Sequence, residues 1–214
     1  MATSQRSLVV LISGNGSNLQ ALIDACGTPK LPNTRITHVI SNRKAAYGLE
    51  RAANASIPTT YHNLVPYKKQ HPDNMDAARA AYDADLAKMM LALSPRPSLI
   101  VCAGWMHIVT ASFLDPIARA GIQIINLHPA LPGEFAGAGA IERAWKAGRE
   151  QGLKRTGVMI HNVIAQVDAG TAIVTREVEL REGEELEALE QRMHAVEHEL
   201  IVEGTRLALG FKGE

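Results

Sequence analysis

Short apolar runs alternate with segments of helical periodicity along most of this chain. The run at 7–12 is continuous, which is typical of parallel strands that are buried on both faces, and further strands are expected at 35–40, 98–103 and 122–127. We therefore predict an α/β fold with three layers, a mostly parallel central sheet and helices on both of its faces. The other expected elements are strands at 59–61, 158–163 and 173–180 and helices at 18–26, 47–55, 74–93, 111–120 and 184–209.

Composition and charge narrow the class of protein. The chain has 22 basic and 22 acidic residues, so no net charge attracts a nucleic acid or an anionic membrane. Its two cysteines, Cys26 and Cys102, form no ligand cluster or CxxC pair, which indicates buried thiols in a reducing compartment and no metal site. The apolar run that follows the opening residues MATSQRS is too short for a signal core or membrane span. We expect a cytoplasmic protein.

A glycine turn follows the first expected strand. Gly16, Ser17 and Asn18 lie where that strand gives way to a helix, and glycine permits close backbone approach there. The free amides and the positive dipole end of a helix start favour an anion, so we predict a phosphate site. The alternative is a tight turn with Asn and Ser as caps. A dinucleotide fingerprint would need glycine at Leu19 and an acid in place of Asn42.

Two polar residues end the strand at 122–127. Asn126 and His128 are two positions apart, so they point to the same side of the strand. Ligands of open parallel sheets lie beyond the carboxyl ends of the strands. There an amide can donate to an oxyanion and an imidazole can shuttle a proton. The alternative is that His128 only caps the strand before Pro129.

Asp168 lies between two expected strands in the sequence Val-Asp-Ala-Gly. This pattern ordinarily indicates a turn. A catalytic role would require this loop to fold back to His128, which spacing alone does not establish.

Several longer segments resemble the phosphoribosylglycinamide formyltransferase family, the folate-dependent enzymes of purine synthesis, and fungal members most closely. The resemblance covers nearly the whole chain and is most specific in NLHPALPG and in the segment that ends in QVDAG. The segments that carry it are ISGNGSNLQALIDAC at 12–26, SNRKAAYGLERA at 41–52, AGWMHIV at 103–109, NLHPALPG at 126–133 and GVMIHNVIAQVDAG at 157–170.

The resemblance implies a single formyltransferase domain over 1–214, with a Rossmann-like phosphate-binding half at about 1–120 and a catalytic and folate-binding half at about 121–214. It also implies the roles of the individual site residues. By position these are Asn126, His128 and Asp168 as the catalytic trio; Gly16, Ser17 and Asn18 at the substrate phosphate; Glu197 at the substrate; and His107, Val109, Ile164, Ala165, Gln166 and Val167 at the folate.

The implied reaction transfers a formyl group from 10-formyltetrahydrofolate, as co-substrate, to the amine of glycinamide ribonucleotide. In this reading Asn126 and a protonated His128 stabilise a tetrahedral oxyanion, and Asp168 keeps the imidazole cationic. No metal takes part, and the partners are small molecules. The sequence indicates no particular oligomeric state. The chain departs from the family pattern at His107, Ala136, Ile141 and Asn162.

Three other classes of protein compete with this interpretation. A relative that formylates a tRNA should carry an added basic C-terminal domain, and one that hydrolyses formylfolate an extra N-terminal domain. A non-catalytic phosphosugar or nucleotide-binding module would not need Asn126, His128 and Asp168 to converge. An NAD(P) oxidoreductase is disfavoured because Leu19 is not the glycine, and Asn42 is not the acid, that a dinucleotide fingerprint requires.

Overall fold

A computed structural model describes residues 5–211 of the chain. Residues 1–4, at the start of the opening segment MATSQRS, lie outside this range. The chain divides into two compact units, Met1–Ile124 and Ile125–Glu214. The sequence analysis placed a division of halves near residue 120.

The first unit contains four strands, paired in parallel in the order β3-β2-β1-β4. Their bounds are Arg6–Ile12 for β1, Thr34–Ser41 for β2, Thr59–Tyr61 for β3 and Leu99–Cys102 for β4. Strand β1 is central, and Leu8–Ile12 are fully buried. This burial on both faces confirms the interpretation of the apolar runs as inner parallel strands.

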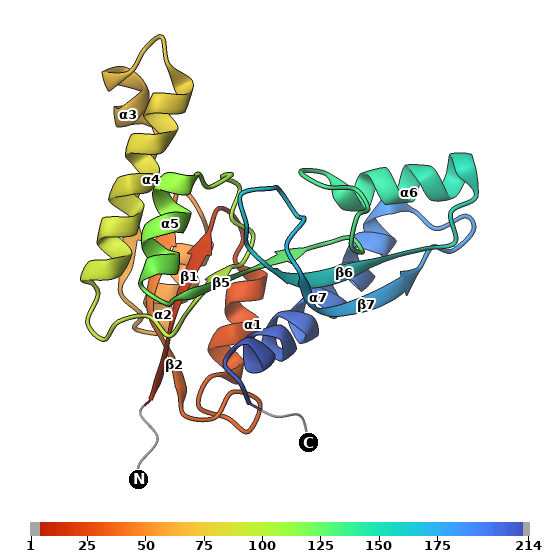
Figure 1. Cartoon of the computed structure of the whole chain (residues 1–214). Helices are drawn as coiled ribbons and strands as arrows, with labels where there is room; N and C mark the ends of the chain where they lie inside the picture. The colour runs from red at the N-terminus through yellow and green to blue at the C-terminus, as the bar shows by residue number, and fades with distance from the viewer. Residues whose placement is uncertain (1–4, 212–214) are drawn as a thin grey trace. The chain divides into compact units, whose positions relative to one another are not determined.

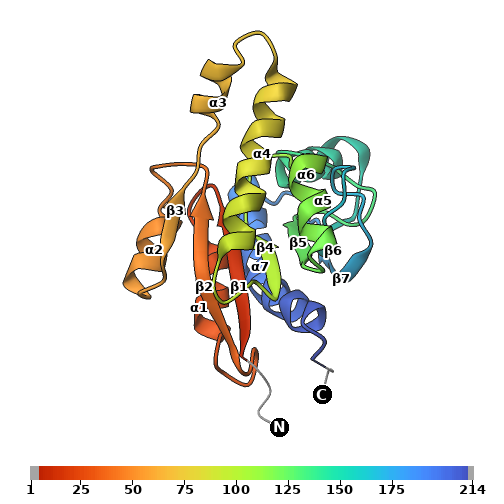
Figure 2. The same cartoon turned by 60° about the vertical axis from the view of Figure 1, so that its left-hand side comes forward.

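Helices cover both sides of this four-stranded sheet. Figure 1 shows α4 and α5 on one side of β1 and α1 on the other. In Figure 2, α3 and the first turns of α4 extend past the ends of β1 and β2. The bounds are Ser17–Ala25 for α1, Gly48–Asn54 for α2, Val65–Gln70 for α3, Met75–Ala92 for α4 and Ala111–Arg119 for α5.

Local sequence explains several of the helix boundaries. The side chain of Asn74 accepts a hydrogen bond from the amide of Ala77 at 2.9 Å, so Asn74 is the N-cap of α4. Helix α1 begins after Gly16, which has φ +76°, and a Cβ there would lie 2.6 Å from Cα of Gly48. Glycine is a poor helix former, and its presence at position 48 of α2 is explained by this close contact with the turn at Gly16.

The second unit is built on antiparallel strands. Strand β5, Gln123–His128, pairs with β6, Arg155–Asn162, which pairs with β7, Ala172–Glu179. Helix α7, Leu186–Ala208, packs on β6 and β7, and α6, Ala140–Gln151, packs on α7. Helix α7 approaches β6 closely at Gly204, where a Cβ would lie 2.6 Å from the side chain of Ile160. The α/β fold is confirmed, with antiparallel pairing in this second unit.

Two helices were missed by the sequence analysis, α3 and α6. Helix α3 is only six residues long and has no buried residue, so it carries no apolar periodicity. Helix α6 starts after Gly139 and ends at Gly152, both at positive φ, and its core-facing residues are the small Ala140, Ala144 and Ala147. Alanines give a weak apolar pattern, although the glycines at both ends were a signal for this helix.

Within residues 5–211, no helix combines the length and the apolar character that a membrane crossing requires.

Candidate active site

Strand β5 presents Asn126 and His128 on one side, as their spacing predicts. Asn126 is half-buried and His128 is 4 % exposed. In the antiparallel ladder, Asn126 lies opposite His161 of β6, and His128 lies opposite Met159. Cross-strand partners share a face of the sheet, so β6 adds a second imidazole to this side of β5.

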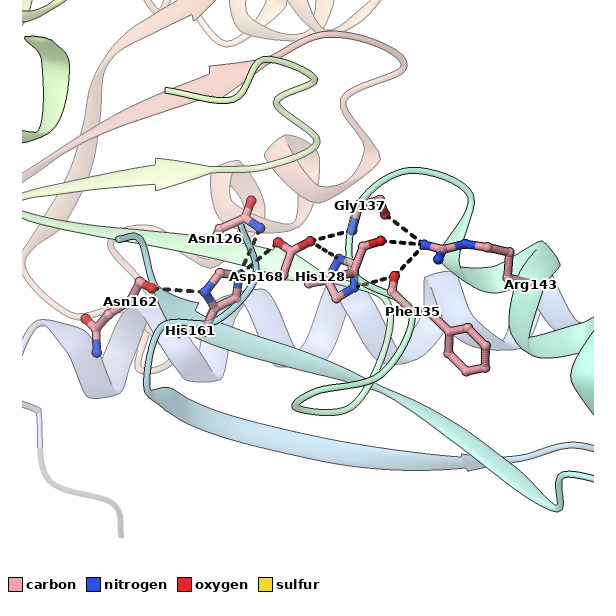
Figure 3. Close-up of polar contacts among 9 residues, drawn as sticks. Asn126, His128, Phe135, Gly137, Arg143, His161, Asn162 and Asp168 are labelled. Atoms are coloured by element: carbon pink, nitrogen blue, oxygen red, sulfur yellow. Dashed lines mark hydrogen bonds and ion pairs between the residues drawn. The ribbon is translucent and has the colours of Figure 1, made fainter. Parts of the chain in front are cut away.

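His161 was not singled out from the sequence, and it holds the amide of Asn126. Nδ2 of Asn126 lies 3.1 Å from Nε2 of His161, and Nδ1 of His161 lies 3.0 Å from the carbonyl oxygen of Asn162 (Figure 3). The carbonyl can only accept, so these contacts assign the ring proton of His161 to Nδ1. Nε2 then accepts from Asn126, and the second N–H of that amide remains to donate elsewhere.

Asp168 folds back to both histidines. Its Oδ2 lies 3.4 Å from Nδ1 of His128, and its Oδ1 lies 3.5 Å from Nε2 of His161. Asp168 itself has φ +52°, a conformation that Asp and Asn adopt more readily than most residues. A Cβ at Gly170 would lie 1.7 Å from the carbonyl oxygen of Asn162, so only glycine lets this loop return so close to β6.

The segment at 133–139, which precedes α6, closes the other side of this cluster. The amide of Gly137 donates to Oδ2 of Asp168 at 2.8 Å, and the carbonyl oxygen of Phe135 lies 3.2 Å from Nε2 of His128 (Figure 3). Asp168 therefore contacts two imidazoles and one backbone amide. Both ring nitrogens of His128 face an oxygen atom.

Burial and hydrogen bonding set the charges of this cluster. Burial lowers the pKa of His128 below its usual 6.5, although Asp168 and the Phe135 carbonyl oppose that shift. Burial raises the pKa of Asp168, but its contacts with His161 and Gly137 outweigh this effect, so its pKa lies below the usual 3.8. At neutral pH the carboxylate is ionised and the neutral imidazole is favoured. This differs from the cationic His128 expected from sequence.

The predicted phosphate turn lies in the first unit. Gly16 and Ser17 are half-buried and Asn18 is buried, at the start of α1. The turn is braced by Arg51 of α2, whose Nε donates to the carbonyl oxygen of Asn15 at 3.0 Å. No side chain caps α1, so its first amides are not used by a cap hydrogen bond.

His107 and Val109 follow β4 in the first unit, in the segment predicted to lie near the folate. Val109 is 9 % exposed. Nε2 of His107 lies 2.8 Å from Oδ1 of Asp83, and the amide of Thr110 donates to Oδ2 of Asp83 at 2.6 Å. Next to His107 in the sequence, Met106 and Ile108 are 70 % and 56 % exposed. Asp83 of α4 therefore fixes a turn that presents two apolar side chains.

We expect Asp83→Ala to lower the free energy of unfolding by about 3 kcal/mol, because it leaves the Thr110 amide and the His107 ring without their buried acceptor. Urea denaturation measures this difference. Asp76→Ala on the same helix is the matched control, since Asp76 is an exposed acid in the first turn of α4. It should cost less than about 1 kcal/mol. Equal losses in the two variants would contradict the structural role of Asp83.

The remaining predicted site residues lie in the second unit. Ile164, Ala165, Gln166 and Val167 are all exposed, in the loop that leads to Asp168. Glu197 of α7 is 6 % exposed. Among the described residues, no group of three or more His, Cys, Asp or Glu side chains could hold a metal ion.

Comparisons with known proteins agree with this arrangement. Residues 6–205 match the family model described as formyl transferase. The chain belongs to the formyl transferase family. It is 52 % identical over 198 residues to phosphoribosylglycinamide formyltransferase of Schizosaccharomyces pombe, covering 92 % of this chain and 94 % of that protein. The protein of the same name in Saccharomyces cerevisiae is 47 % identical over 206 residues, with the same coverage.

Bacterial members of the formyl transferase family are more distant. The Escherichia coli phosphoribosylglycinamide formyltransferase is 34 % identical, covering 90 % of this chain and 82 % of that protein. The solved structure of glycinamide ribonucleotide transformylase 1 from Geobacillus kaustophilus has a TM-score of 0.81 at 33 % identity, and covers 96 % of this chain and all of that one. The resemblance to fungal members is confirmed. Enzymes of this family use a formylfolate as co-substrate.

Proposed function

We propose that this chain transfers the formyl group of 10-formyltetrahydrofolate to the amine of glycinamide ribonucleotide. The observation that carries this proposal is the convergence of Asn126, His128 and Asp168, from positions up to 42 residues apart, on one side of β5. A module that only binds its ligand has no use for an amide donor, an imidazole and an ionised carboxylate in contact. Acyl transfer uses all three.

In the proposed mechanism, the lone pair of the substrate amine attacks the formyl carbon, and the carbonyl electrons move to oxygen. The second N–H of Asn126 donates to this oxyanion, while His161 keeps the amide oriented. The proton that the amine loses passes to Nδ1 of His128, beside the carboxylate of Asp168. The carbonyl then re-forms, the bond from carbon to the folate nitrogen breaks, and that proton goes to the nitrogen.

The neutral imidazole fits the first step of this mechanism. His128 is a base before attack, and the oxyanion then favours the imidazolium form, because a nearby negative charge raises the pKa of an imidazole. Asp168 stays ionised throughout. The proposed phosphate contacts are Gly16, Ser17 and Asn18, with Glu197 at the substrate. The proposed folate contacts are His107, Val109 and Ile164–Val167. A cytoplasmic location and exclusively small-molecule partners stay predictions.

The direct test is to mix the protein with glycinamide ribonucleotide and 10-formyltetrahydrofolate and to follow the absorbance of the folate product. We expect product only when both substrates are present. Loss of the formyl group at an equal rate without the ribonucleotide would indicate a hydrolase and contradict the proposal. If no product formed under either condition, the protein would be a non-catalytic binding module.

The pH dependence tests the protonation state of His128. The substrate amine must be deprotonated, with a pKa of about 8 by analogy with α-amino groups. His128 must also be neutral, and its pKa lies below 6.5. The logarithm of kcat/KM should therefore rise with pH with a slope of about 1 below pH 8, and steepen towards 2 below the pKa of His128. A rate that falls as pH rises through 6 to 7 would show that the cationic ring is the active form.

A further inference from the structure

The guanidinium of Arg143 contacts three successive backbone carbonyl oxygens of the loop that covers the candidate active site. Nη2 of Arg143, on the first turn of α6, lies 2.5 Å from the carbonyl oxygen of Phe135, 2.8 Å from that of Ala136 and 3.5 Å from that of Gly137. Its guanidinium also lies 5.8 Å from the centre of the Phe135 ring. Figure 3 shows Arg143 on the opposite side of this loop from Asp168.

The backbone of this loop would not converge in this way by itself. Phe135 has φ +45° and Gly137 has φ +83°, and a non-glycine residue at positive φ is strained. Three successive carbonyl dipoles also point to one place and repel each other. A cation at that place offsets the repulsion, and the planar, always charged guanidinium is well suited to it.

Two of the three loop residues that Arg143 holds, Phe135 and Gly137, also contact the catalytic pair. The carbonyl oxygen of Phe135 faces Nε2 of His128, and the amide of Gly137 donates to Asp168. A neutral imidazole has one ring proton, and the two oxygens that face His128 can only accept. The contact at Nε2 is the one with hydrogen-bond geometry, so we place the proton there. Nδ1 then carries the lone pair and faces Asp168, where the proposed mechanism needs a base.

We propose that Arg143 is a positioning residue for formyl transfer, which holds the 135–137 backbone so that Phe135 fixes the tautomer of His128 and Gly137 fixes the carboxylate of Asp168. This inference rests on the proposed function of the cluster. Arg143 itself touches neither the imidazole nor the carboxylate in any of the contacts described.

The exposure of Arg143 separates this role from simple stabilisation. The side chain is on the surface, where ion and hydrogen-bond contacts contribute little to global stability. Its effect on the loop should therefore appear in the geometry of the site and in turnover. The melting temperature should change by less than about 4 °C, as for a surface substitution in a domain of this size.

The test compares Arg143→Met and Arg143→Lys with Arg149→Met. Arg149 lies on the same helix, with its guanidinium over the ring of Trp145, so its replacement removes the same charge without touching the loop. We expect Arg143→Met to lower kcat about tenfold, as small displacements of catalytic groups do. Arg143→Lys should lose less, and Arg149→Met should resemble the unchanged protein.

Two spectroscopic measurements need no turnover. Hydrogen exchange at the Gly137 amide should accelerate about tenfold in Arg143→Met, because local opening of the loop becomes easier. The ¹⁵N shifts of the His128 ring should change from the Nε2–H tautomer to a mixture. Unchanged exchange and shifts in Arg143→Met would overturn the inference, and so would an equal loss of kcat in Arg149→Met. If the unchanged protein transfers no formyl group, the proposed function fails, and these two measurements still decide whether Arg143 holds the loop.

Discussion

Asp168→Asn should lower kcat by about a hundredfold or more, because it removes the carboxylate beside the ring that accepts the proton. The fold should be unaffected. Asp168 has φ +52°, which asparagine adopts easily, and the new amide oxygen can still accept from Gly137. The carboxylate also raises the pKa of His128, so the pKa of this ring should fall further in the variant. Steady-state kinetics and an NMR titration of His128 measure these two effects.

Asp115→Asn is the matched control for this substitution, since Asp115 is an exposed acid of α5. Its kcat should stay within about twofold of the unchanged protein. Near-normal turnover in Asp168→Asn would remove this residue from the mechanism. A lowered kcat with an unchanged pKa of His128 would show that the carboxylate acts in some way other than through that ring.

Asn126→Ala should lower kcat by about 10²- to 10³-fold, the usual cost of losing one donor to an oxyanion. Substrate affinity should change less, because the full negative charge exists only in the transition state. The loss should therefore appear in kcat more than in KM. Both constants follow from the same formyl-transfer assay.

Gln123→Ala is the control for Asn126→Ala, because it removes a half-buried amide from the same strand. We expect its kcat to stay within about threefold of the unchanged protein. If Asn126→Ala raised KM and left kcat unchanged, Asn126 would bind the substrate without stabilising the oxyanion.

Much of the first unit could be predicted from short segments. The β1 run is continuously apolar from Leu8 to Ile12, and Asn74 is followed at once by a long helical pattern. The turn at Gly16 follows the same logic, because a glycine between a strand and a helix has few alternatives. In each case residues close in sequence decide the structure.

The candidate site could be predicted only in part from residues that are close in sequence. The period of two along β5 placed Asn126 and His128 on one face. It could not reveal His161, because the partner of Asn126 depends on the register of an antiparallel strand that begins almost thirty residues later. The contacts of the 133–139 loop with Asp168 could not be predicted either, and α6, which carries Arg143, was missed.

The sequence by itself determined the α/β class, the strands, and the presence of an amide, an imidazole and a carboxylate in motifs that resemble the formyltransferases. Only the tertiary structure decided that Asp168 returns to His128, that His161 holds Asn126, and that burial favours a neutral imidazole. The physical reason is the distance along the sequence over which each effect acts. Backbone propensities and apolar periodicity act over a few residues, whereas register, close approach at Gly170 and desolvation depend on segments that meet only when the chain has folded.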